Sequence, residues 1–82
     1  GRDMNRHELH RAITAAGKDA RFSIRDEPDP DSLPDFTTVM EPEVDRSGWT
    51  VFYVERLEKD DVHHFDTEAE ACDYVNGLID RV

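Results

Sequence analysis

The longest apolar stretch of the chain covers residues 49–57 and reads WTVFYVERL. Aromatic and β-branched residues fill it, and both are typical of strands. Successive side chains of a strand point to opposite faces. The odd-numbered residues therefore share one face: Trp49, Val51, Tyr53, Glu55 and Leu57. Because the even-numbered face is also apolar, we predict an inner strand, covered by helices on one side and at least partly on the other.

Two further stretches have the apolar spacing of amphipathic helices. The first covers residues 6–16. Asn5 and Glu8 have the spacing of a capping box at its start, and Gly17 follows as a stop. The second begins at the capping box of Thr67 and Glu70. Its apolar stripe consists of Ala71, Cys72, Val75, Leu78, Ile79 and Val82.

Three shorter strands are predicted, at residues 21–25, 36–40 and 62–65. The first two are separated by residues 26–35, which hold three of the four prolines and five acidic residues. Proline blocks regular structure and like charges repel, so we expect an extended, mobile loop there. Polar residues at 41–48 are expected to close a hairpin, and those at 58–61 to form a turn.

The order helix, four strands, helix predicts a small α+β fold. An antiparallel sheet of about four strands, with both helices on one face, is the simplest way to bury both helical stripes. Residues 4–82 are then a single domain that includes the acidic, proline-rich loop at 26–35. Residues 1–3 precede Met4 and are interpreted as a cloning remnant.

The net charge of the chain limits the kinds of partner that we expect. The 82 residues carry 20 acidic and 10 basic side chains, for a net charge of -10. Nucleic acids and anionic membranes favour basic surfaces, so neither is an expected partner. A single cysteine allows no internal disulfide, no apolar run approaches a membrane span, and no signal peptide is apparent. We therefore expect a cytoplasmic protein.

Catalytic and metal chemistry have little support. Adjacent His63 and His64 on a strand point to opposite faces, and His7 and His10 lack an obvious third ligand. Cys72 lies on the apolar stripe of the second helix, among carboxylates that oppose thiolate formation. The sequence has no phosphate-binding glycine loop. We predict neither an enzyme nor a protein with a bound cofactor or metal.

The acidic loop is either a solvated connection or a contact surface for a basic protein. The second interpretation makes its carboxylates candidate partner-binding residues: Asp26, Glu27, Asp29, Asp31 and Asp35. The face of the sheet away from the helices is a second candidate, with Trp49, Tyr53 and Glu55 as contacts if it is open. The alternative is that the loop or long side chains cover this face.

The pattern Trp49-x-Val51-x-Tyr53-x-Glu55-Arg56 is followed by Phe65-x-Thr67-Glu68-x-Glu70-Ala71-Cys72-x-Tyr74. Together with residues 5–17, it resembles a set of small actinobacterial proteins that occur beside or within polymorphic toxin systems. Some of those systems have NAD-glycohydrolase-type toxin domains. Those proteins resemble immunity proteins. The resemblance implies an inhibitor that covers a toxin active site, and it assigns no binding residue.

We therefore expect a non-enzymatic protein-binding module, most concretely an immunity protein that occludes a basic site on a cognate toxin or enzyme. The alternative is a structural or regulatory homodimer, joined through the outer face of the sheet.

Overall fold

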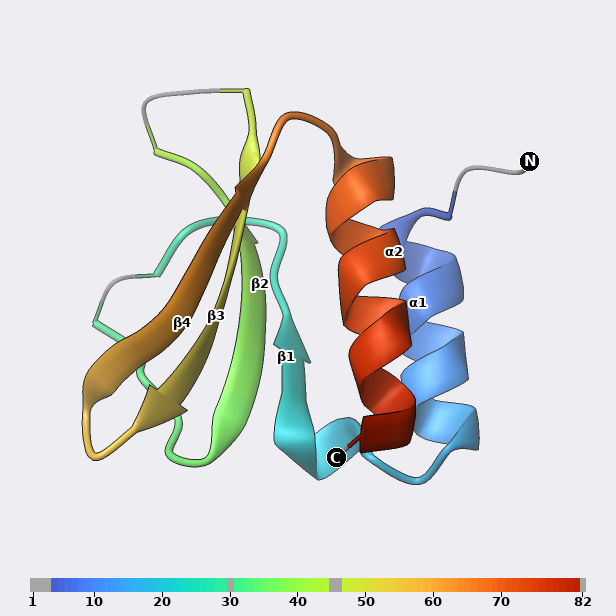
Figure 1. The fold of residues 1–82 in the computed structure, drawn as a ribbon, viewed down its shortest axis with the longest axis horizontal. Coiled ribbons are helices and arrows are strands. Elements are labelled where there is room, and N and C mark those ends of the chain that lie inside the picture. The colour runs from blue at the N-terminus through green and yellow to red at the C-terminus, as the bar shows by residue number, and fades with distance from the viewer. Residues whose placement is uncertain (1–3, 30, 45–46, 82) are drawn as a thin grey trace.

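A four-stranded sheet and two α-helices packed on one of its faces form the two layers of the protein (Figure 1). The computed structural model describes residues 4–29, 31–44 and 47–81. The elements in chain order are α1 (Arg6–Ala15), η1 (Asp19–Arg21), β1 (Phe22–Ile24), β2 (Thr37–Pro42), β3 (Trp49–Glu55), β4 (Glu58–Phe65), α2 (Glu68–Leu78) and η2 (Ile79–Arg81). The predicted α+β class and element order are confirmed. The predicted remnant at residues 1–3 lies outside the described residues, as do Pro30 and Val82.

Both helices begin at the caps that the sequence predicts. Asn5 Oδ1 accepts a hydrogen bond from the Glu8 amide at 2.9 Å, and Thr67 Oγ1 accepts one from the Glu70 amide at 3.2 Å. Gly17 follows α1 with φ +71, a conformation that favours glycine. The two helices run side by side in the same direction, so their N-terminal ends lie together (Figure 1). No helix in the described part of the chain is long and apolar enough to cross a membrane.

The sheet has the strand order β1-β2-β3-β4. The β2–β3 and β3–β4 pairs are antiparallel, as predicted. In contrast, β1 pairs parallel with β2, and Ser23 lies opposite Val39. The prediction of a wholly antiparallel sheet is wrong at this pair. Parallel neighbours need a connection of about a dozen residues. Residues 25–36, which we call the crossover, provide it on the face opposite the helices (Figure 1).

The β3–β4 hairpin turns at Arg56 and Leu57, whose φ angles are 54 and 65. Positive φ at both central residues is the mark of a type I′ turn. The predicted turn at 58–61 is instead the start of β4. As an edge strand, β4 can expose polar side chains to water. A bulge at Asp61, with φ 51, then shifts the register opposite β3.

Apolar side chains are buried on both faces of the sheet. The cluster under the helices consists of Leu9, Ile13, Phe22, Met40, Trp49, Val51, Ala71, Cys72, Val75 and Ile79. On the outer face, Val39, Phe52 and Val54 form a second cluster, and Leu33 of the crossover packs against it. The crossover therefore covers part of the outer face, which is one of the two alternatives that the sequence left open.

Candidate functional site

An ion pair between the partly buried Arg25 and the buried Glu41 anchors the crossover to the sheet. The two side chains are 12% and 8% exposed, and Arg25 Nη1 lies 3.0 Å from Glu41 Oε2. The same guanidinium donates to the carbonyl oxygens of Asp29 at 3.0 Å and Ser32 at 2.6 Å. Glu41 Oε2 also accepts the Asp29 amide at 3.0 Å. The segment that we expected to be mobile thus has a defined set of hydrogen bonds.

The five acidic residues of the predicted loop fall into two groups. Asp26 pairs with Arg6, and Asp35 Oδ1 accepts the backbone N–H of Arg56 at 2.7 Å. These two carboxylates hold elements of the fold together. The side chains of the other three are exposed and form no ion pair with a described residue: Glu27, Asp29 and Asp31. Neutralising this second group would therefore break no ion pair among the residues that the structure describes.

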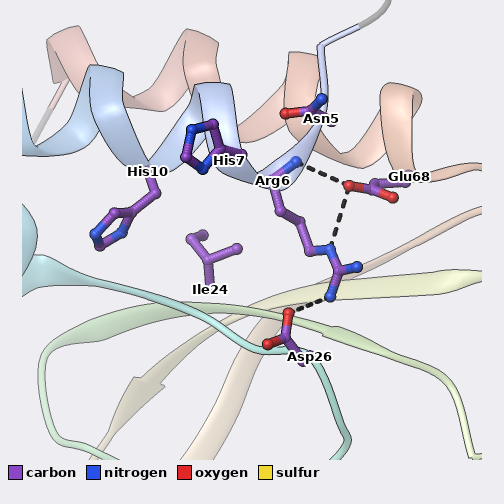
Figure 2. A pocket seen from close by; sticks show the side chains of 7 residues that line it. All are labelled: Asn5, Arg6, His7, His10, Ile24, Asp26 and Glu68. Carbon is purple, nitrogen blue, oxygen red and sulfur yellow. Dashed lines mark hydrogen bonds and ion pairs between the residues drawn. The ribbon is translucent and has the colours of Figure 1, made fainter.

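Arg6 joins the N-terminal ends of both helices to the crossover (Figure 2). Its backbone N–H and its Nε both donate to Glu68 Oε2, at 2.8 and 3.2 Å. Its Nη1 pairs with Asp26, and the guanidinium lies 4.9 Å from the centroid of the Trp49 ring. A carboxylate at a helix N-terminus is favourable because it faces unpaired amides. Arg6 is thus paired with the carboxylates of both Glu68 and Asp26, so we interpret this cluster as structural.

The three predicted contact residues of β3 do not form a patch on the outer face. Trp49 is 9% exposed and belongs to the helix-side cluster. Tyr53 is half-buried on the same side, where it lines a hollow together with Tyr74 of α2. Glu55 is exposed at the end of the strand. Because odd-numbered residues of β3 face the helices along with Val51, the premise of an open aromatic outer face is wrong.

A hollow remains on the outer face between the crossover and β4, and we call it the outer hollow. Its lining residues are Pro28, Glu41, Pro42, Glu43, Val44, Thr50, Lys59, Val62 and His64. Val44 is 74% exposed and Val62 is 44% exposed, so apolar walls are open to water. Sequence reasoning missed this site because several segments distant in the chain build it. The two valines, each flanked by polar residues, were the available signal.

Cys72 is a poor nucleophile in this structure. Its side chain is fully buried in the helix-side cluster. Burial first, and then the carboxylates of Glu68 and Asp73, raise the pKa of the thiol to about 11. Because the thiolate is the reactive form, the thiol is inert near neutral pH. This observation agrees with the expectation from the sequence that neighbouring carboxylates oppose thiolate formation.

The four histidines do not converge on a metal site. His63 packs against a tyrosine of α2, with ring centroids 4.7 Å apart. His64 Nδ1 lies 2.9 Å from Glu43 Oε1, which lines the outer hollow. His7 and His10 lie on α1 beside the Arg6 cluster (Figure 2). Among the residues that the structure describes, no group of three His, Cys, Asp or Glu side chains could hold a metal ion.

A scan against protein-family models found no match, and searches of curated proteins and of solved structures found none either. The resemblance to immunity proteins therefore stays a prediction. Fold and site geometry define the class: a small α+β domain whose acidic crossover lies over the outer face of the sheet.

Proposed function

We propose that this protein is a non-enzymatic protein-binding module that inhibits a basic partner, most concretely an immunity protein that covers the active site of a cognate toxin. One observation carries the proposal. The carboxylates of Glu27, Asp29 and Asp31 are exposed without an ion-pair partner among the described residues. The Arg25–Glu41 pair meanwhile holds the backbone beneath them in place. The net charge of -10 supports a basic partner.

The anchoring of the crossover matters for binding. A surface that is already ordered loses less conformational entropy on association than a free loop. Fixed carboxylates also steer a basic partner toward the outer face and accelerate the encounter, an effect that salt screens. The mechanism is steric occlusion, with the carboxylates meeting the basic rim of the partner's site.

The alternative of a homodimer draws on the exposed Val44 and Val62 of the outer face. A symmetric dimer brings the same patch of both copies together. The unpaired carboxylates of the crossover would then face each other, and like charges across an interface are unfavourable. We therefore favour a different, basic protein. Light scattering separates the two proposals, because a concentration-independent dimer supports only the second.

We propose the cytoplasm as the compartment. The single cysteine is a free, buried thiol, as is common in reducing compartments.

The test begins with a pull-down from source-organism lysate at low salt. A captured basic protein is then purified, and its association kinetics are measured against salt. We expect the variant Glu27→Gln/Asp29→Asn/Asp31→Asn to associate about tenfold more slowly at low salt and with a flatter salt dependence. The matched control Asp19→Asn/Asp73→Asn/Asp80→Asn changes as many exposed charges elsewhere. Equal effects of both triple variants, or no effect of either, would refute the role of the crossover.

A further inference from the structure

The outer hollow has apolar walls, and acidic residues lie in and next to it in the chain. Pro28 and Pro42 contribute to its walls, and so do the exposed side chains of Val44 and Val62. Pro28 belongs to the crossover and lies in the chain directly between Glu27 and Asp29, whose carboxylates have no ion-pair partner in the described structure. A ligand that fits these surroundings has an apolar body and a positive end.

A basic side chain of the protein itself already lines the hollow. Lys59 of β4 lines it, and its Nζ lies 4.6 Å from the centroid of the Phe52 ring. Phe52 is 1% exposed, so its ring is otherwise covered by the outer cluster and the crossover. A cation over an aromatic face is attracted by the ring quadrupole. No carboxylate of a described residue forms an ion pair with Lys59, so among the described residues its ammonium contacts the Phe52 ring instead.

The two acidic residues that line the hollow, Glu41 and Glu43, already have partners. Glu41 is paired with Arg25. Glu43 Oε1 accepts a hydrogen bond from Thr50 Oγ1 at 3.2 Å and lies close to the His64 ring. An incoming cation therefore finds its unpaired negative charge on the crossover side, at Glu27 and Asp29.

We infer that the outer hollow receives one arginine or lysine side chain of the basic protein partner, which takes the place of Lys59 on Phe52. The aliphatic stem of the incoming side chain lies along the proline and valine walls, as long basic side chains do on apolar surfaces. Its charged end meets the negative field of the crossover. Lys59 is thus an internal competitor that swings into solvent when the partner binds. This inference rests on the proposed function and names the group that the site recognises.

The test uses a peptide probe, Ac-Gly-Val-Arg-Val-Gly-NH2, and a twin in which citrulline replaces arginine. Chemical-shift titration at low salt measures both affinities. We expect the arginine peptide to bind more tightly and to shift the methyl signals of Val44 and Val62 together with the Lys59 side chain. Shifts at those valines that appear on concentrating the protein alone would identify a second copy as the occupant and overturn the inference.

Two variants locate the contact. Lys59→Met keeps an apolar stem and removes the competing charge, so we expect arginine-peptide affinity to rise about two- to fivefold. Val62→Lys places a cation in the hollow and should weaken binding about fivefold or more. Leu57→Lys is its matched control, because it adds the same charge at an exposed apolar position at the hairpin turn, outside the hollow. We expect a change of less than about twofold there, as befits a screened surface charge.

The inference is overturned if Val62→Lys and Leu57→Lys weaken binding equally, or if the citrulline peptide binds as well as the arginine peptide. Either result leaves the proposed function to its own test, because slower partner association on neutralising the crossover does not depend on the hollow. Conversely, if the hollow passes both variant tests and the kinetic test with the partner fails, the hollow binds a basic side chain but the role of the crossover carboxylates in partner association is refuted. A spectrum with native dispersion for each variant shows that folding is retained.

Discussion

Replacing Arg25 by methionine tests the claim that a buried ion pair holds the crossover in place. The change keeps most of the aliphatic stem and removes the guanidinium. Three contacts disappear with it, to the carbonyl oxygens of Asp29 and Ser32 and to the carboxylate of Glu41. Glu41 then stays buried, and among the described residues the Asp29 amide is the donor that remains to it.

The expected loss is large for a protein of this size. Removing one partner of a buried pair destabilises by about 3–5 kcal/mol, because the other charge stays out of water. A chain of this length has a free energy of unfolding of roughly 4–12 kcal/mol. We therefore expect Arg25→Met to lower the free energy of unfolding by about 3 kcal/mol or more. The crossover, which carries the proposed partner-binding carboxylates, should lose order as well.

Urea unfolding, followed by circular dichroism, measures this loss, and hydrogen exchange of the Asp29 amide reports on the crossover itself. Arg21→Met is the matched control, because Arg21 is exposed and has no ion pair with a described residue. We expect that control to change stability by less than about 0.5 kcal/mol. The double variant Arg25→Met/Glu41→Leu leaves no isolated carboxylate and should recover part of the loss.

The reasoning is refuted if Arg25→Met costs no more than Arg21→Met, or if the Asp29 amide exchanges at the same rate in both variants. It is also refuted if the double variant is no more stable than Arg25→Met, because an isolated buried carboxylate would then not be the cause of the loss. Each of these results would mean that the other contacts of the crossover hold it on the sheet without the Arg25 guanidinium, namely the packing of Leu33 and the contacts of Asp26 and Asp35.

Two further predictions concern the hairpin and the buried thiol. Left-handed Arg56 and Leu57 are costly for side-chain-bearing residues, so Arg56→Asn/Leu57→Gly should raise the free energy of unfolding by about 1 kcal/mol. Leu57→Ala, which keeps the positive φ, should give no gain, and an equal gain would contradict the argument. Cys72 ionises near its usual pKa of 9.0 when unfolded but near 11 when folded. Stability should therefore fall as pH rises from about 9 to 11. Cys72→Ala should lack that component, and parallel curves for the two proteins would count against it.

Local signals predicted the elements well. The predicted N-caps at Asn5 and Thr67 are confirmed, because capping depends on residues three apart in sequence. The apolar run at 49–57 contains β3, and its two apolar faces are both covered. The strands that follow weaker patterns were predicted less well. β4 begins at Glu58, four residues before the predicted strand, since a polar edge strand has no apolar alternation to reveal it.

The candidate site was predicted only in part. All five acidic residues of the loop were identified, but which of them are unpaired depends on Arg6 and on the hairpin amide of Arg56, both distant in sequence. The side of the sheet on which Trp49 lies could not be predicted from the sequence either. Alternation shows that Trp49 and Val51 share a side, whereas the packing of both helices decides which side that is.

Short stretches of the chain are enough to predict the α+β class, the helix starts, the inner strand and the acidic character of the connection at 26–35, because each depends on local spacing or composition. The parallel pairing of β1 with β2 and the course of the crossover over the outer face are seen only in the folded protein. The same holds for the outer hollow beside β4. The physical reason is that each of these features depends on a long-range contact. The Arg25–Glu41 pair and the packing of Leu33 direct the crossover over the sheet, and no local pattern in the chain encodes either one.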